Sequence, residues 1–207
     1  MLARLGSIAS ILAATMLSFA APSFTAPAAP SDTEVVFFTP SIPAGPPRDG
    51  SCWTRSIALD RPGVWRCMVG NEIHDPCFQA PPRENELVCD ANPASGKTGF
   101  VLKLSKPLPA QPAPSTWPSA WILKLADGSI CEPFTGTRPA VNGEPAQWYC
   151  VKRGVEPSPA TNSLVTQVHP GKPWVADRFA ESAATGNPAT AARRIRAETI
   201  PVLKVWQ

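Results

Sequence analysis

Six cysteines are the residues whose type and spacing most clearly predict chemistry in this chain. They stand at positions 52, 67, 77, 89, 131 and 150. An even number of cysteines in an exported protein is typical of a disulfide framework, although sequence alone leaves the connectivity open. We expect neighbours to pair in order, because each bond then closes a short loop: Cys52–Cys67, Cys77–Cys89 and Cys131–Cys150. A zinc or thiol-redox site is not favoured, because nine residues separate even the closest pair, Cys67 and Cys77.

The two histidines do not predict a hydrolase dyad. A serine hydrolase needs a base beside its nucleophile, and the chain offers only His74 and His169 and no G-x-S-x-G motif. His74 adjoins Asp75, but neighbouring side chains on an extended chain point to opposite faces. Asp75 before Pro76 is typical of a turn, and His169 before a Pro-Gly pair is typical of an exposed loop. We therefore assign no catalytic residue.

Paired carboxylates are the second enzymatic possibility, because a glycosidase places two of them across a cleft. Spacing pairs none of the acidic candidates, and one of them, Asp127, is assigned to a hairpin turn. These candidates are Asp60, Asp75, Glu86, Asp90, Asp127, Glu132, Glu144 and Glu156. No phosphate loop, H-E-x-x-H helix or dinucleotide fingerprint is present, so no cofactor and no metal is expected. A secreted hydrolase that acts on cell wall or polysaccharide through unidentified carboxylates remains the alternative function.

Tryptophan content favours a binding role instead. The seven tryptophans stand at 53, 65, 117, 121, 148, 174 and 206. Tryptophan is frequent at interfaces and also in cores. We expect Trp53, Trp65, Trp121 and Trp148 in the core, and Trp117 as a contact residue for a partner. The favoured interpretation is a non-catalytic binding module for a protein, a glycan or peptidoglycan, and a purely structural envelope protein comes third.

Export is predicted from the first twenty residues. Residues 1–20 combine Arg4 with an apolar run and the small-residue cleavage pattern Ser18-Phe19-Ala20, the three parts of a secretory signal. A membrane anchor is the other interpretation, but the run is interrupted and shorter than the ~20 residues of a spanning helix. The expected location is periplasmic or extracellular, with no membrane span after cleavage. A formal charge of +3 does not point to nucleic acid as a partner.

The remaining chain is predicted to form one mainly β domain. The 26 prolines disfavour helices. Residues 21–50 form a Pro/Ala-rich leader in which residues 35–38 are a candidate edge strand. Residues 51–207 form a single disulfide-stapled domain, with an irregular cysteine-rich lobe at 51–90 and an antiparallel sheet at 99–207.

Strand patterns are clearest in the second half. Alternating apolar residues predict strands at 100–104 and 121–125, and Asp127-Gly128 predicts a hairpin into 129–131. Further strands are expected at 147–152, 173–179 and 200–206. Exposed loops are expected at 161–171 and 182–194, with one short helix possible within 183–192. Residues 107–118 contain five prolines, which predict an extended connector or a ligand for a partner groove.

One block resembles a known pattern. Residues 51–58 read SCWTRSIA and residues 65–78 read WRCMVGNEIHDPCF. This block resembles a group of bacterial secreted proteins with a CWTxSIA…RCMxGNxIxDPCF pattern. Elements similar to Asp127-Gly128, Cys131 and Tyr149-Cys150 follow it in that group. The resemblance implies export and a stapled domain in a bacterial envelope, and it carries over no catalytic residue.

Overall fold

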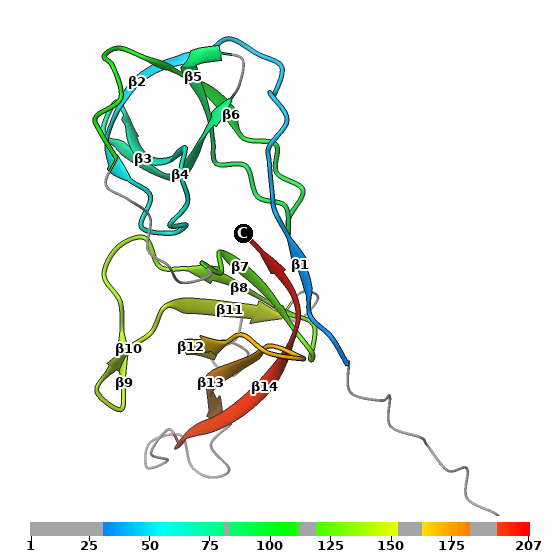
Figure 1. Cartoon of the computed structure of the whole chain (residues 1–207). Coiled ribbons are helices and arrows are strands. Elements are labelled where there is room, and N and C mark those ends of the chain that lie inside the picture. The colour runs from blue at the N-terminus through cyan, green and yellow to red at the C-terminus, as the bar shows by residue number, and fades with distance from the viewer. Residues whose placement is uncertain (1–30, 81–82, 112–118, 153–162, 183–193) are drawn as a thin grey trace, which may run out of the picture.

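Strands are the regular secondary structure of the described part of the chain, and turns and loops connect them. A computed structural model describes residues 31–80, 83–111, 119–152, 163–182 and 194–207 (Figure 1). Within these ranges fourteen strands and no helix occur, so the predicted mainly β class is confirmed. None of the described residues forms a helix long and apolar enough to cross a bilayer.

The first half of the domain is a closed barrel of five strands, seen at the top of Figure 1. Consecutive strands pair antiparallel, and the parallel pairing of the first with the last closes the barrel. Its strands are β2 (Arg48–Arg55), β3 (Val64–Val69), β4 (Glu72–Ala80), β5 (Arg83–Cys89) and β6 (Phe100–Leu104). A buried cluster that includes Leu87 and Leu102 fills its interior around four of the cysteines.

The second half is a seven-stranded sheet that closes on itself. Six of its strands form a hydrogen-bonded circuit, because β14 pairs with β13 and also with β7. β1 (Glu34–Val36) adds in parallel to the end of β14, and β9 (Ala140–Val141) and β10 (Glu144–Pro145) form a separate hairpin. The six strands are β7 (Ile122–Leu125), β8 (Ser129–Pro133), β11 (Trp148–Lys152), β12 (Ser163–His169), β13 (Val175–Ser182) and β14 (Arg194–Trp206).

Three disulfides fasten neighbouring strands, and their pairing is the neighbour order that the sequence predicts. They are Cys52–Cys67, Cys77–Cys89 and Cys131–Cys150. Each joins residues that lie directly opposite in antiparallel strands. Two of the disulfides lie in the barrel and the third lies in the sheet. Each bond therefore also fixes the register of the residues beside it.

An aromatic core joins the barrel to the sheet. Phe78 of β4 packs against Trp121, just before β7, with ring centroids 5.4 Å apart. Phe38, which follows β1, contacts both rings at 5.6 Å. Leu59 and Trp206 belong to the same buried cluster. The two halves therefore share one core.

Several sequence expectations about local structure are wrong. The cysteine-rich lobe is a regular barrel instead of an irregular lobe, and the barrel extends to Leu104 because β6 completes it. Residues 161–171, expected as an exposed loop, contain β12, in which Val165 is fully buried against the sheet core. The 21–50 leader also contains the start of β2 at Arg48, whereas β1 agrees with the edge strand expected at 35–38. These pairings join distant segments, so local patterns do not reveal them.

Two single-residue expectations also fail. Asp75-Pro76, expected as a turn, lies inside β4. Trp53, expected in the core, is 43% exposed on the barrel surface, where Arg66 lies over its ring. Trp65 and Trp121 are buried as expected, and Trp148 is partly buried. The proposed signal at 1–20, the contact residue Trp117 and the segment 183–192 lie outside the described residues.

Gly99 is expected to be essential to the loop that follows β5. It has a positive φ of 78°, and an added Cβ would lie 2.1 Å from the carbonyl oxygen of Cys89. Gly99→Ala should therefore lower the free energy of unfolding by about 3 kcal/mol. Gly96→Ala is the matched control, because Gly96 has a similar φ of 75° but open space around it. That control should cost about 1 kcal/mol. Equal losses for both variants in urea unfolding would contradict the close approach.

Candidate functional site

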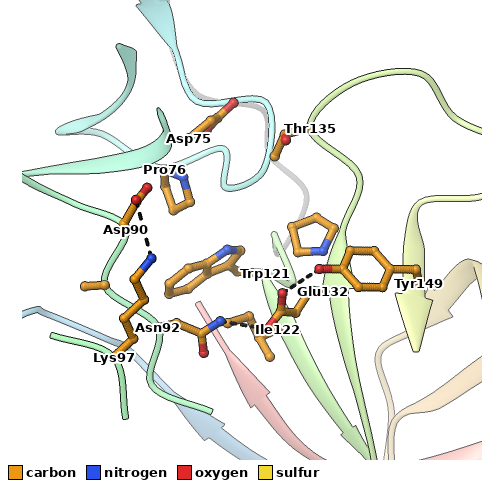
Figure 2. Close-up of a pocket in the computed structure, with 12 residues that line it drawn as sticks. Asp75, Pro76, Asp90, Asn92, Lys97, Trp121, Ile122, Glu132, Thr135 and Tyr149 are labelled. Atoms are coloured by element: carbon orange, nitrogen blue, oxygen red, sulfur yellow. Dashed lines mark hydrogen bonds and ion pairs between the residues drawn. The ribbon is translucent and has the colours of Figure 1, made fainter. Parts of the chain in front are cut away.

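A cleft between the barrel and the sheet is the candidate site. Its cavity of about 250 Å³ is shown in Figure 2. The buried side chains of Trp121 and Ile122 belong to its lining, and polar groups from both halves converge on it. Its lining residues include Asp90, Asn92 and Lys97 from the barrel and Glu132, Thr135 and Tyr149 from the sheet. Trp121 belongs both to this lining and to the core that the two halves share, so the shape of the cleft depends on how the halves pack.

The barrel wall of the cleft is a tight loop after β5. Asn92 and Lys97 exchange backbone hydrogen bonds across this loop. The side-chain oxygen of Asn92 accepts from the amides of Ala94 and Ser95, at 3.0 and 3.1 Å. These bonds orient the amide group of Asn92, whose Nδ2 donates to Glu132 Oε1 on the sheet at 2.7 Å. Asn92 is thus a polar link between the two halves.

Glu132 and Tyr149 face each other across β8 and β11. They are directly paired in the strand register, one position from the Cys131–Cys150 disulfide. The Tyr149 hydroxyl donates to Glu132 Oε2 at 2.7 Å, and Figure 2 shows this bond beside the Asn92 bond. Each oxygen of the Glu132 carboxylate therefore accepts one internal hydrogen bond from a neutral donor. Phe134 packs on the Tyr149 ring at 5.5 Å.

The charge of Glu132 affects the ionisation of Tyr149. Burial is the largest influence on the tyrosine, and the hydrogen bond and negative charge of Glu132 add to it. Together they raise the pKa of Tyr149 from 10.0 to about 12. Tyr149 therefore remains a neutral hydrogen-bond donor throughout the neutral pH range.

Asp75 lies at the upper edge of the cleft but is held away from it. Its carboxylate accepts from the Ser56 hydroxyl, from the Ile57 amide at 3.2 Å and from Arg66 Nη1 at 3.1 Å. The side chain is 1% exposed, and in Figure 2 its oxygens point away from Trp121. Burial raises the pKa of Asp75 despite the opposing effects of Ser56, Ile57 and Arg66. Asp75 therefore has a structural role, because it joins residues of the barrel through these hydrogen bonds.

His74 and Lys97 both engage Asp90. His74 Nδ1 lies 3.0 Å from Asp90 Oδ1, and Lys97 Nζ lies 3.4 Å from Asp90 Oδ2. His74 is buried, its Nε2 has no hydrogen-bond partner, and its ring packs edge-on against Phe100 at 4.9 Å. No serine or threonine hydroxyl is hydrogen-bonded to this histidine within the described ranges. The arrangement does not form a nucleophile–base pair.

Two other sequence candidates, His169 and Asp127, lie apart from the cleft, and Glu156 lies outside the described residues. His169 pairs with Asp177 at 2.7 Å on the sheet surface. Asp127, expected in the hairpin turn, accepts from the Ser129 amide and from Arg178. Burial alone would raise the pKa of Asp127, but the bonds from Arg178 and Ser129 outweigh it and lower the pKa. Asp127 is therefore a structural residue of the β7–β8 turn.

The sulfur atoms of three barrel cysteines also lie together. The Sγ atoms of Cys67, Cys77 and Cys89 lie within 4.8 Å of one another. All three are disulfide-bonded, so they offer no thiolate to a metal ion. This grouping is part of the barrel core.

Asn92 and Tyr149 were not among the residues predicted from sequence, and Glu132 was only one of eight unpaired carboxylates. The sequence did contain one indication that Glu132 and Tyr149 lie together. A disulfide between Cys131 and Cys150 on antiparallel strands places Glu132 directly opposite Tyr149. No comparable signal existed for Asn92, because its partner lies in the other half of the domain.

The titration of Tyr149 tests this geometry directly, because it is the only tyrosine in the chain. The absorbance of the phenolate after rapid pH jumps should give a midpoint near 12 in the native protein. Glu132→Gln removes the negative charge, so the midpoint should move part of the way back toward 10.0. Glu84→Gln, on the exposed start of β5, is the control and should leave the midpoint unchanged. A native midpoint near 10 would contradict both the burial of Tyr149 and its contact with Glu132.

Comparisons with known proteins add no information about this site. No family model, no curated protein and no solved structure matches the chain. The resemblance of the 51–78 block to a bacterial secreted group therefore stays a prediction. What the cleft does is argued below from its own residues.

Proposed function

We propose that the protein is an exported, non-catalytic binding module that captures its partner in the cleft between barrel and sheet. The observation that carries this proposal is the Asn92–Glu132–Tyr149 network. It holds a carboxylate in one orientation at the mouth of a preformed cavity. Binding sites are typically concave, with a few oriented polar groups over an apolar base. This cleft has those features.

Export is supported by the cysteines. All six are disulfide-bonded, and such bonds persist in oxidising compartments outside the cytoplasm. A cleaved signal at residues 1–20 is the finer part of the proposal. A bacterial envelope setting rests on the resemblance of the 51–78 block. The proposed location is therefore periplasmic or extracellular.

The state of the carboxylates favours binding over hydrolysis. A glycosidase needs one carboxyl group to protonate the leaving group and a second one opposite. Asp75 has the raised pKa of such an acid, but its oxygens face Ser56, Ile57 and Arg66. Asp90 is engaged by His74 and Lys97. Among the residues that the structure describes, Glu132 is then the one lining carboxylate without a cationic partner, and a single free carboxylate is too few for this mechanism.

The partner classes proposed are a protein, a glycan or peptidoglycan, and not a nucleic acid. Three carboxylates and one lysine line the cleft, so its charge opposes a phosphate backbone. The small formal charge of the whole chain agrees with this exclusion. Which of these three partner classes the protein binds depends on the chemical group that enters the cavity.

Filling the cleft tests the proposal. Thr135→Trp places a large ring at a lining position, whereas Thr137→Trp makes the same change at an exposed position two residues away. Both variants are compared with the native protein for retention on insoluble peptidoglycan, on a glycan array and on immobilised peptides. The expected result is a probe that the native protein and Thr137→Trp retain and that Thr135→Trp loses at least about tenfold.

Two results would contradict the proposal. One is capture that survives Thr135→Trp unchanged while the melting temperature is also unchanged, because the partner then binds elsewhere. The other is turnover of any polysaccharide or cell-wall probe that Glu132→Gln abolishes. That result would restore the hydrolase alternative.

A further inference from the structure

The charges that line the cleft do not cancel. Asp75 is paired with Arg66, and Asp90 is paired with Lys97. Among the described residues, Glu132 accepts side-chain hydrogen bonds from Asn92 and Tyr149, which are both neutral. In the described part of the chain, no lysine, arginine or histidine nitrogen forms an ion pair with Glu132. One negative charge at the cleft is therefore left without a cation.

Glu132 is also able to accept more hydrogen bonds. An ionised carboxylate offers about four acceptor positions, and Asn92 and Tyr149 occupy two of them. The other acceptor positions remain available to a ligand. Asn92 and Tyr149 already fix the rotamer of Glu132, so binding would cost little side-chain entropy. A fixed anion with free acceptor capacity recognises a cationic donor better than a neutral one.

The aromatic rings of the cleft suit a cation better than a sugar. A sugar stacks on a broad exposed ring face, but the indole of Trp121 is only 3% exposed. The accessible aromatic ring is that of Tyr149, which is 39% exposed. Its hydroxyl donates a hydrogen bond to Glu132. A carboxylate beside an aromatic face is a favourable setting for an ammonium or guanidinium group. Trp121 therefore offers no stacking face to a glycan, and the accessible ring is the one beside the carboxylate.

The size of the cavity limits what enters it. At about 250 Å³ it is smaller than the roughly 300–1,000 Å³ of pockets that enclose drug-sized ligands. One functional group on a short stem fits this space, and a chain of several sugars does not. The site is also poorly suited to a divalent metal ion. Asn92 and Tyr149 donate hydrogen bonds to Glu132 and do not offer oxygen ligands beside it.

We infer that the cleft takes a protonated amine or guanidinium group of its ligand, with Glu132 as the anion that anchors it and Tyr149 as the adjacent ring. This inference rests on the proposed binding function of the same cleft. A basic side chain of a peptide and a small free amine both carry this chemistry. The test separates these two sources.

The experiment is a titration followed by NMR, with the backbone amides of Glu132 and Tyr149 as reporters. The probes are an end-capped Gly-Gly-Lys-Gly-Gly peptide, its arginine counterpart, its Nε-acetylated counterpart and n-butylamine. The lysine and arginine peptides should shift both reporters and bind at least about tenfold more tightly than the acetylated peptide. Butylamine binding as tightly as the peptides would identify a small amine as sufficient, and weaker binding would identify a peptide.

Glu132→Gln is the decisive variant, and Glu84→Gln is its charge-matched control on β5. Glu132→Gln should weaken the affinity for the lysine peptide by at least about tenfold, while Glu84→Gln should leave that affinity unchanged. The melting temperatures of both variants establish that they are folded. Equal affinity for the charged and acetylated peptides, or for the native protein and Glu132→Gln, would overturn the inference. Absence of any shift from the charged probes up to about 10 mM would overturn it as well.

A neutral oligosaccharide separates this failure from failure of the proposed function. N-acetylglucosamine oligomers that shift the same reporters, and lose binding in Thr135→Trp but not in Glu132→Gln, would leave the cleft as the binding site. The cation inference would then be wrong and the proposed function would stand. Binding of charged peptides that Thr135→Trp does not affect would contradict both.

Discussion

The aromatic contact between barrel and sheet is the interaction on which the rest of the structure depends. The ring centroids of Phe38, Phe78 and Trp121 lie within 5.6 Å of one another, and Trp121 also lines the cleft. Arg61 secures the same contact, because its guanidinium donates to the backbone carbonyls of Phe38 and Gln207. Burial lowers the pKa of Arg61, and its ring contact with Phe78 keeps it over the aromatic cluster. Without this core the two halves would share few contacts, and the cleft would have no fixed walls.

Several strands from residue 100 onward were predictable from local patterns, and so was half of the candidate site. Alternation and turn chemistry predicted β6, β7 and β8, because each depends on neighbouring residues. The expected Cys131–Cys150 bond also determines the register that places Glu132 opposite Tyr149. That consequence follows from antiparallel geometry alone. It shows that a disulfide pairing carries information about side chains next to the bond.

The remaining features depend on contacts between distant segments, which local patterns do not encode. The barrel closes through a parallel pairing of β2 with β6, and β1 pairs with the far end of β14. Trp53 was expected inside, but the register of β2 directs it outward beside Arg66. Asn92 reaches Glu132 only after both halves are packed. The chemistry of the cleft, a single fixed carboxylate beside an aromatic ring, is therefore a product of tertiary packing.

A rigid junction between the two halves is the central claim, because a preformed cleft requires it. Residual dipolar couplings of backbone amides in weakly aligned protein measure the relative orientation of the two halves in solution. The structure predicts that one alignment tensor fits the couplings of both the five-stranded barrel and the sheet, in the orientation shown in Figure 1. Two tensors of clearly different magnitude or direction would show independent motion of the halves. That result would contradict a preformed cleft and the binding role assigned to it.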